Sequence, residues 1–269
     1  MTTIKETHVL NSSPAVSLRY CGSGPLVVFL HGIGGNATNW DRQLAVLASE
    51  YTAVAWDMRG YGRSEDYAGP LLLDDLCDDL ASVLDHFESS KAHIAGLSMG
   101  GMIAQEFYRR SPNRVSTLLL ANTNVGFGAA FTNQQKTEFV QLRRQPLLEG
   151  KKPRDLLPSM LEVLLGPNPP SSAIENISAS ILGLRKESYI KAIEAIVDFD
   201  SSDITTDIAV PVLLVSSTCD RVIPLDFMEL MNDSLPDSEL FVFQQVGHLT
   251  NLERPEEFNE LMLDFLAQN

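Results

Sequence analysis

The sequence predicts an α/β fold in which helices cover both faces of a mostly parallel β-sheet. Short apolar runs of strand length alternate with amphipathic stretches of helical period up to about residue 125, and the alternation returns after residue 204. Continuous apolar strands are typical of parallel sheets, because both faces of such a sheet are buried. The segment between the two alternating parts contains helical patterns without a convincing strand.

The first alternating part contains a series of expected strands and helices. Strands are predicted at residues 16–20, 26–30, 52–56, 92–97 and 115–121, and helices at residues 39–49, 71–87 and 102–110. The helix at 71–87 has an apolar stripe, because its apolar residues from Leu72 to Phe87 recur near the 3.6-residue period. The helix at 102–110 stops before Pro112.

The second alternating part and the segment before it complete the predicted organisation. Strands are expected at 211–216 and 239–244, and helices at 226–232 and 255–267. In the middle segment, helices are expected at 132–144, 153–165 and 171–199, punctuated by Pro and Gly. A helical block inserted into an α/β pattern predicts a lid. We therefore expect a core of residues 1–125 and 204–269, and a lid of residues 126–203.

Composition limits the class of protein. The 269 residues suffice for one domain with a large insertion. The net charge of −15 argues against nucleic-acid and anionic-membrane partners. The three cysteines have neither disulfide-framework nor metal-ligand spacing, and no stretch approaches the roughly 18 apolar residues of a membrane span. Because the N-terminus also lacks a signal-peptide pattern, we expect a cytoplasmic protein. We further expect a monomer or homodimer that binds a small-molecule substrate and no metal.

The chemistry is indicated by Gly96-Leu97-Ser98-Met99-Gly100, a G-x-S-x-G pentapeptide. It follows an apolar strand and precedes a helical stretch, and in that context the motif forms a sharp strand-to-helix turn that exposes a nucleophilic serine. The two flanking glycines leave room for the neighbouring strand and helix at the turn. The sequence therefore predicts Ser98 as a nucleophile.

A serine nucleophile needs a base within hydrogen-bond reach. Of the five histidines, His31 and His248 follow strands at the edge of the sheet where Ser98 is expected. His248 lies between a strand and the last helix and is the predicted base. His93 precedes the strand that leads to Ser98, so it is expected at the opposite end of that strand.

The base needs an acid to orient it, and this acid is expected after a late strand. Asp220 follows the strand at 211–216, whereas Asn122-Thr123-Asn124 after the strand at 115–121 contains no carboxylate. Asp226 is a weaker alternative, because it is expected on the helix beyond the loop. The order Ser98, Asp220, His248 matches the serine, acid, histidine order of this class of triad.

Acyl transfer also needs hydrogen-bond donors for the oxyanion that forms. The first expected donor is the backbone N–H of Met99, directly after the nucleophile. The second is expected from the loop at residues 31–35, whose glycines let the backbone approach a ligand closely, and we assign it to the N–H of Ile33. His31 is expected to brace this loop rather than to act in catalysis.

Five segments together resemble the α/β-hydrolase superfamily: the His31-Gly32 loop, Asp57–Ser64 (DMRGYGRS), the GLSMGG turn, Asp220–Pro224 and Gly247-His248. Within it, GLSMGGMIAQ and LLLANT resemble 3-oxoadipate enol-lactonases and related esterases. The resemblance covers roughly residues 15–125 and 205–269. It implies an eight-stranded, mostly parallel sheet, a helical lid after the sixth strand and no cofactor. DMRGYGRS lacks the Gly-Lys-Ser/Thr of a P-loop, so its arginines, Arg59 and Arg63, are expected in structural ion pairs.

Three functions fit these observations. The first is hydrolysis of an ester or lactone of a small molecule through an acyl-enzyme. Four aromatic residues either line its pocket or pack in the core: Trp40, Phe127, Phe131 and Phe139. The second cleaves a carbon–carbon, amide or enamide bond of a ring-degradation product at the same site. The lid arginines are candidate partners for a carboxylate on such substrates: Arg143, Arg144 and Arg185. The third is a non-catalytic ligand-binding protein, which the intact triad candidates disfavour.

Overall fold

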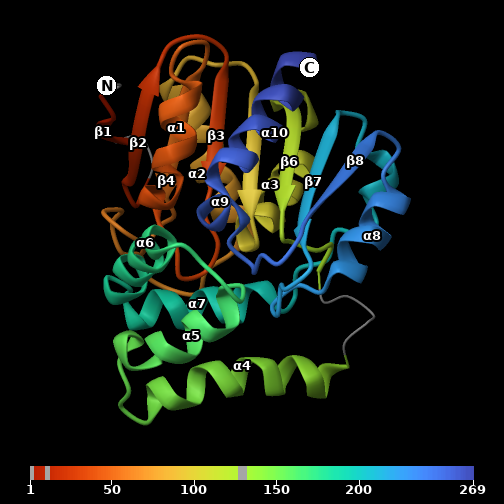
Figure 1. The fold of residues 1–269 in the computed structure, drawn as a ribbon. Coiled ribbons are helices and arrows are strands. Elements are labelled where there is room, and N and C mark those ends of the chain that lie inside the picture. Colours follow the sequence, from red (N-terminus) through yellow and green to blue (C-terminus); the bar gives the residue numbers. More distant parts are fainter. Residues whose placement is uncertain (1–2, 10–12, 127–131) are drawn as a thin grey trace.

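The computed structural model of the protein describes residues 3–9, 13–126 and 132–269, and it contains an eight-stranded sheet (Figure 1). The strand order is β1-β2-β4-β3-β5-β6-β7-β8. β2 pairs antiparallel with β1 and β4, and the other neighbouring strands run parallel. The strands are β1 Lys5–Val9, β2 Val16–Gly22, β3 Leu26–Leu30, β4 Thr52–Asp57, β5 Ala92–Leu97, β6 Val115–Ala121, β7 Val212–Ser217 and β8 Ser238–Phe243.

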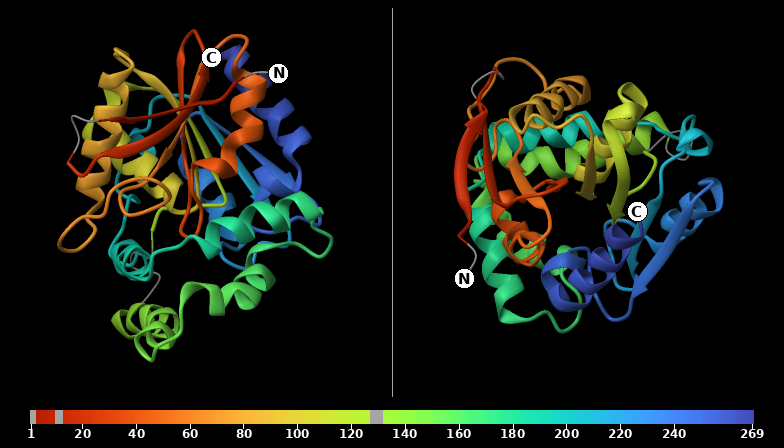
Figure 2. Two further views of the ribbon diagram at one scale, coloured as in Figure 1. Left: turned by 90° about the vertical axis from the view of Figure 1, so that its left-hand side faces the viewer. Right: turned by 90° about the horizontal axis from the view of Figure 1, so that it is seen from above.

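Helices cover both faces of the sheet and enclose two apolar layers (Figure 2). On one face, Leu44 and Phe258 belong to the same buried cluster as Phe29 of β3. On the other face, Leu80 and Phe107 pack in a cluster with alternate strand residues. The first face is covered by α1 Asp41–Leu47, α9 Thr250–Glu253 and α10 Pro255–Gln268, and the second by α2 Leu73–His86, α3 Met99–Arg110 and α8 Leu225–Ser234. Burial from both sides explains why the central strands are continuous apolar runs.

A block of helices lies between β6 and β7 in the chain and faces the carboxyl ends of the parallel strands (Figures 1 and 2). The block contains α4 Asn133–Leu148, the 3₁₀ turn η3 Pro153–Leu156, α5 Leu157–Leu164, α6 Ser171–Leu182 and α7 Lys186–Ile196. Its two ends meet, because Gly126 forms an antiparallel bridge with Asp200 and Ser201 N donates to Val125 O over 2.7 Å. The chain therefore leaves the core and returns to it at the same place.

Most predicted elements are confirmed, and the differences have local causes. β3, β5 and β6 have the predicted bounds. β1 was not predicted as a strand, because it is an edge strand with mostly exposed residues. The helix predicted over 171–199 is two helices, since α6 ends at its C-cap Gly183 and α7 begins at Lys186. No helix in the described ranges is long and apolar enough to span a membrane.

Candidate active site

Ser98 lies at the turn between β5 and α3, in a backbone conformation that serine rarely adopts. Its φ is 55° and its ψ is −120°. Glycines make the turn possible, because a Cβ on Gly96 would lie 2.3 Å from Gly100 O, and one on Gly100 would lie 2.1 Å from Leu30 O. Non-glycine residues with positive φ store backbone strain, which persists only where the surrounding structure holds it. The turn thus matches the geometry expected for an exposed nucleophile.

His248 and Asp220 are hydrogen-bonded to each other. His248 Nδ1 lies 2.8 Å from Asp220 Oδ2, and only 3% and 0% of the two side chains are exposed. Because Nδ1 of a neutral imidazole donates to the carboxylate, Nε2 keeps a lone pair that can accept a proton. The arrangement is therefore that of a base oriented by an acid.

The carboxylate of Asp220 accepts hydrogen bonds at both oxygens. Oδ1 accepts from the N–H of Val222 (2.7 Å) and of Ile223 (3.0 Å), and Oδ2 accepts from His248 and from Asn122 Nδ2 (2.9 Å). Burial alone would raise the pKa of Asp220, but the electrostatic interaction and hydrogen bond with His248 and the N–H groups of Ile223 and Val222 outweigh it and hold the pKa below its usual value. Asp220 is therefore ionised at neutral pH.

Asn122 is a site residue that the sequence did not reveal. It directly follows β6, is fully buried, and has a φ of 45° in the left-handed region that Asn tolerates better than most residues. Besides Asp220, its Nδ2 donates to Ser217 Oγ (3.1 Å), and its Oδ1 accepts from Thr250 Oγ1 (3.0 Å). The loop after β6, which contains no carboxylate, thus supplies the amide of Asn122 that donates a hydrogen bond to Asp220.

The loop after β3 is braced by His31, as predicted. His31 Nδ1 donates to Gly32 O (2.9 Å) and Nε2 accepts from the N–H of Met58 (3.0 Å), so both ring nitrogens are engaged. Burial lowers the pKa of His31, which keeps the ring neutral. Among the described residues, no acceptor is bonded to the N–H of Ile33 or to that of Met99 at the first turn of α3.

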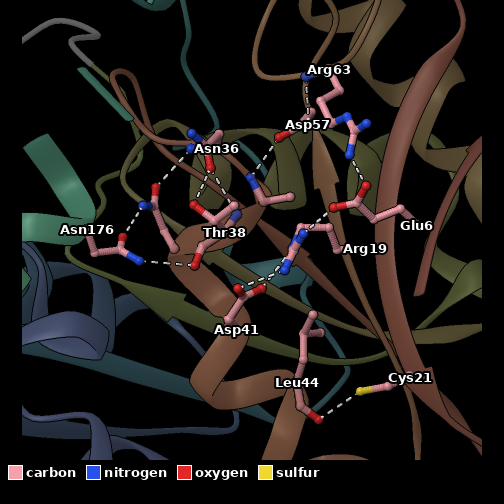
Figure 3. Close-up of polar contacts among 12 residues, drawn as sticks. Glu6, Arg19, Cys21, Asn36, Thr38, Asp41, Leu44, Asp57, Arg63 and Asn176 are labelled. Carbon is pink, nitrogen blue, oxygen red and sulfur yellow. Dashed lines mark hydrogen bonds and ion pairs between the residues drawn. The ribbon is translucent and has the colours of Figure 1, made fainter. Parts of the chain in front are cut away.

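Polar contacts hold the segment that follows this loop, the 3₁₀ turn η1 Ala37–Trp40 (Figure 3). Asp57 at the end of β4 accepts from the N–H of Ala37 (2.8 Å) and of Arg63 (2.9 Å). On the lid side, Asn176 Nδ2 of α6 donates to Thr38 O over 3.2 Å (Figure 3). Helix α6 is therefore hydrogen-bonded to the chain next to the candidate oxyanion loop.

The DMRGYGRS segment is structural, as predicted. Arg59 forms a buried ion pair with Asp79, with Nε 2.7 Å and Nη2 2.9 Å from the two carboxylate oxygens. Arg63 pairs with Glu6 of β1 (Figure 3). Both arginines therefore brace the turn after β4 and have carboxylate partners of their own.

Ser98 and His248 line one pocket at the carboxyl ends of the strands, with about 350 Å³ of empty space, part of it open solvent. Much of the remaining wall is apolar, and it comprises His31, Gly32, Ile33, Gly35, Asn39, Trp40, Leu97, Ile177, Leu249, Asn251 and Leu252. The sequence did not single out Ile177, which comes from lid helix α6 and lies 79 positions after Ser98.

Of the predicted aromatic pocket residues, Trp40 lines the pocket and also packs in the core. Its ring centroid lies 4.9 Å from that of Phe29 and 6.1 Å from that of Phe258. Both interpretations of Trp40 therefore hold together. Phe127 and Phe131 lie outside the described residues.

The three arginines that are candidates for binding a carboxylate differ in their partners. Arg144 pairs with Glu194 over 2.6 Å, and Arg185 pairs with Asp66 over 2.8 Å. Arg143 has no carboxylate partner within the described parts of the chain. Of these three candidates, Arg143 is therefore the one without an acid partner among the described residues.

Arg143 stacks on an apolar cluster that reaches the candidate oxyanion loop. Its guanidinium carbon lies 3.6 Å from the ring centroid of Phe139, whose carbonyl accepts from Arg143 Nη1 over 3.1 Å. Phe139 and Ile33 both pack against the cluster that contains Tyr189. Burial lowers the pKa of Arg143, partly opposed by Tyr189. A half-buried cation without an acid partner is costly, and an anionic ligand would offset that cost.

The other histidines lie away from Ser98. His93 is the second residue of β5, where its Nδ1 lies 2.9 Å from Thr117 Oγ1, and His86 ends α2. His8 lies in the edge strand β1. In the residues that the structure describes, no group of three or more His, Cys, Asp or Glu side chains is arranged to hold a metal ion.

A family model described as the alpha/beta hydrolase fold matches residues 25–255. The chain belongs to the α/β-hydrolase fold family. The mostly parallel eight-stranded sheet of this α/β-hydrolase, with helices inserted after β6, is the architecture that the sequence resemblance implied. The match spans every strand from β3 to β8.

Relatives of this α/β-hydrolase align over most of their length. The 3-oxoadipate enol-lactonase 2 of Acinetobacter baylyi is 27% identical over 249 residues, which cover 91% of each chain. The 2-hydroxy-6-oxononadienedioate/2-hydroxy-6-oxononatrienedioate hydrolase of Escherichia coli K12 is 31% identical, covering 92% of this chain and 89% of the relative. The structure of a thermophilic esterase from Thermogutta terrifontis has a TM-score of 0.87 at 25% identity, and the match covers 100% of this chain and 98% of the esterase. These relatives support hydrolase activity.

Proposed function

We propose that this α/β-hydrolase is a serine hydrolase that cleaves an ester or lactone bond of a small molecule through an acyl-enzyme. The observation that carries the proposal is one pocket lined by Ser98, on a strained turn, and by His248, which is bonded to the buried Asp220. A partly exposed serine on such a turn, a base with a free nitrogen and an ionised acid are the parts that acyl transfer requires.

In the proposed reaction, His248 Nε2 takes the proton of Ser98 Oγ as that oxygen attacks the substrate carbonyl carbon. The carbon–oxygen bond to the alcohol part then breaks, and the alcohol oxygen takes the proton from His248. A water molecule, deprotonated by His248, then attacks the acyl carbon. The bond from that carbon to Ser98 Oγ breaks, Oγ takes the proton back from His248, and the acid is released. Asp220 stays ionised, holds the imidazole in the required tautomer and stabilises its protonated form.

The proposed oxyanion hole consists of the N–H groups of Ile33 and Met99. The loop and the nucleophile are in close approach, because a Cβ on Gly32 would lie 2.9 Å from Ser98 Cβ. Met99 is the first residue of α3, so its N–H belongs to the positive end of the helix dipole. Donors that are fixed before the reaction stabilise the developing negative charge without reorganisation.

We propose residues 126–203 as the lid, and residues 1–125 and 204–269 as the core that carries the chemistry. The bridge between Gly126 and Asp200 supports these boundaries, because it closes the base of the inserted block. Trp40 and the lid residue Ile177 would contact the apolar part of the substrate. A compact apolar group beside the scissile carbonyl fits this wall.

The proposed substrate also carries a carboxylate, which Arg143 would bind. The support is its half-buried guanidinium without an acid partner, on the cluster that also contacts Ile33. Two of the relatives are named for dicarboxylates, 3-oxoadipate and an oxononadienedioate. A single local cation can bind such a group although the net charge of the protein is −15.

A second candidate function is cleavage of a carbon–carbon bond at the same site. It is favoured by the 31% identical hydrolase of E. coli, whose named substrates are oxo-dienedioate and oxo-trienedioate compounds. The same serine, histidine and aspartate would serve both reactions. Turnover of a vinylogous 1,5-diketo acid that exceeds turnover of every ester and lactone tested would favour this candidate.

The nucleophile is tested by covalent labelling and by substitution. A fluorophosphonate should modify Ser98 alone, as located by peptide mass mapping, and Ser98→Ala should abolish both the labelling and the turnover of a p-nitrophenyl ester. Ser90→Ala, at an exposed serine after α2, is the control and should change neither. Labelling at another serine, or full turnover by Ser98→Ala, would reject the proposal.

The carboxylate is tested with a matched pair of lid variants. Arg143→Gln should raise KM for an ester that carries a carboxylate and leave KM unchanged for the methyl-capped analogue. Arg144→Gln, at the arginine already paired with Glu194, should change neither value. An unchanged KM for the acidic ester in Arg143→Gln would remove the anionic part of the proposed substrate.

A further inference from the structure

Glu253 is a buried carboxylate that the proposed mechanism does not use. It ends the short helix α9, and only 2% of its surface is exposed. Its Oε1 accepts from the N–H of Gly247 over 3.0 Å, and its Oε2 accepts from the N–H of Gly166 over 2.9 Å. One side chain therefore bonds the residue next to His248 and a residue just beyond lid helix α5.

A third hydrogen bond joins the same two segments directly. The N–H of His248 donates to the carbonyl of Leu164, the last residue of α5, over 2.8 Å. Leu165 is buried in the same apolar cluster as Val246 and Leu249. The backbone at Gly247 and His248 is thus bonded to Glu253 and to the end of α5, while the ring of His248 is bonded to Asp220.

The contact between the two segments leaves no room for a side chain. A Cβ on Gly247 would lie 2.4 Å from Gly166 N, and one on Gly166 would lie 2.8 Å from Gly247 N and 2.9 Å from Glu253 Oε2. In such a close contact, a shift of the end of α5 must move residue 247. The two glycines and the carboxylate form one rigid joint.

The loop of the candidate acid is joined to the same helix. Arg221, directly after Asp220, donates from Nη1 to the carbonyl of Glu162 over 2.6 Å. The last turn of α5 therefore contacts the loops after both β7 and β8. A movement of this turn would therefore also move the loops that carry Asp220 and His248.

We propose that Glu253 is a positioning residue that couples the lid to the catalytic base. Its carboxylate holds the end of α5 and the backbone before His248 in one arrangement, so the imidazole reaches Ser98 only while this part of the lid is seated. The inference rests on the proposed function, because it takes His248 as the base of Ser98.

The physical reason is that only an ionised carboxylate suits both N–H groups. Each oxygen of the carboxylate accepts one N–H, and hydrogen bonds to a charged acceptor are roughly twice as strong as neutral ones. A glutamine has the same shape but one acceptor oxygen, so its NH₂ group would face a backbone N–H. Glu253→Gln therefore breaks the joint without creating a cavity.

The test separates positioning from folding. In Glu253→Gln, kcat per fluorophosphonate-titrated site should fall about 10- to 100-fold, the size expected for a displaced catalytic group, with KM for a small ester nearly unchanged. Hydrogen exchange at the amides of Gly166, Gly247 and His248 should accelerate together. Glu260→Gln, at an exposed glutamate on α10, is the matched control and should behave as wild type.

A second variant approaches the joint from the lid. Gly166→Ala leaves Glu253 intact but pushes on Gly247, so it should lower kcat per titrated site in the same way. An unchanged kcat per titrated site in both variants, with only a lower melting temperature, would overturn the inference and leave the proposed nucleophile standing. Failure of the wild-type enzyme to be labelled at Ser98 would instead overturn the proposed function, and this inference with it.

Discussion

Asn122→Asp should make the stability of the protein fall as the pH rises. In the wild type, Asn122 Nδ2 lies 2.9 Å from Asp220 Oδ2 in a fully buried site. Aspartate has nearly the same shape, but it places a second carboxylate oxygen beside that of Asp220. Two carboxylates at hydrogen-bond distance share one proton, so the pKa of the added carboxyl rises in the folded state.

The magnitude follows from the linkage between protonation and folding. An aspartate in the unfolded chain titrates near pH 3.9, so below about this pH the added carboxyl is protonated in both states and carries no ionisation penalty. Above it, the free energy of unfolding falls by about 1.4 kcal/mol per pH unit until the folded-state pKa is reached. A shift of about 3 units, typical of buried groups, gives a loss of about 4 kcal/mol at pH 8.

The assay is urea unfolding at pH 5 and at pH 8, followed by the fluorescence of the buried Trp40 and Trp56. Between pH 5 and pH 8, the free energy of unfolding of Asn122→Asp should fall by about 2–3 kcal/mol more than that of the wild type. Asn122→Ala lacks the added charge. Its free energy of unfolding should be about 1.5–3 kcal/mol below that of the wild type at both pH values, because the substitution removes a hydrogen bond to an ionised group. Equal pH dependence of the Asp and Ala variants would refute the contact with an ionised Asp220, and Asn122→Asp/Asp220→Asn should abolish the added dependence.

Asp220→Asn should lower kcat by roughly 10⁴-fold in a folded protein, because the amide favours the wrong tautomer of His248; a loss below tenfold in steady-state ester hydrolysis would contradict its role. Ile33→Pro, which lacks the donor, should lower kcat about 10²–10³-fold, whereas Ile33→Ala keeps the N–H and should change kcat little. Equal kcat values for these two variants would exclude Ile33 as a donor. Burial, and then the charge of Lys91, lowers the pKa of His93 to about 4. The unfolded chain therefore binds this proton first, and stability should fall by about 3 kcal/mol as the pH drops from 6.5 to 4. His93→Gln should lose that part of the pH dependence in thermal unfolding.

The elements predicted best are those that depend on local pattern. β3, β5 and β6 are almost fully buried, so most of their residues are apolar and their bounds can be read from the sequence. β1 has the opposite character, because its pattern KETHV is mostly exposed and its pairing partner is β2 alone. An edge strand of this kind is specified by its neighbour rather than by its own apolar period.

The lid shows a second limit of local pattern. The helical period continues through residues 171–199, but Gly183 ends α6 and the chain turns before α7. Conversely, α4 continues past its predicted end at 144 to Leu148, with Pro146 inside the helix. Helix ends in this block depend on packing between helices, which propensity describes only weakly.

The candidate site divides in the same way. Ser98, Asp220 and His248 were predicted because each follows a strand within a short motif, and the hydrogen bond between the last two is present in the structure. Asn122 and Glu253 were not predicted, because no short motif marks them and each bonds a partner far along the chain, Asp220 and Gly166 respectively. The sequence showed that a carboxylate is missing at position 122, but not that the amide there supports the acid.

The topology of the sheet explains why the candidate catalytic groups lie together at one edge of the sheet. It also explains why the candidate substrate contacts on α4 and α6 can change without changing those groups. Adjacent parallel strands β3, β5, β6, β7 and β8 are each followed by one part of the site: Ile33, Ser98, Asn122, Asp220 and His248. Strand spacing of about 4.8 Å sets the distance between successive parts, so the order of strands is also the order of the groups. The wall from α6 and the cation Arg143 on α4 follow no such register. Substitutions on those helices should therefore alter KM among substrates, whereas substitutions at residues 164–166 should alter kcat, because this segment is hydrogen-bonded to Glu253 and to the backbone of His248.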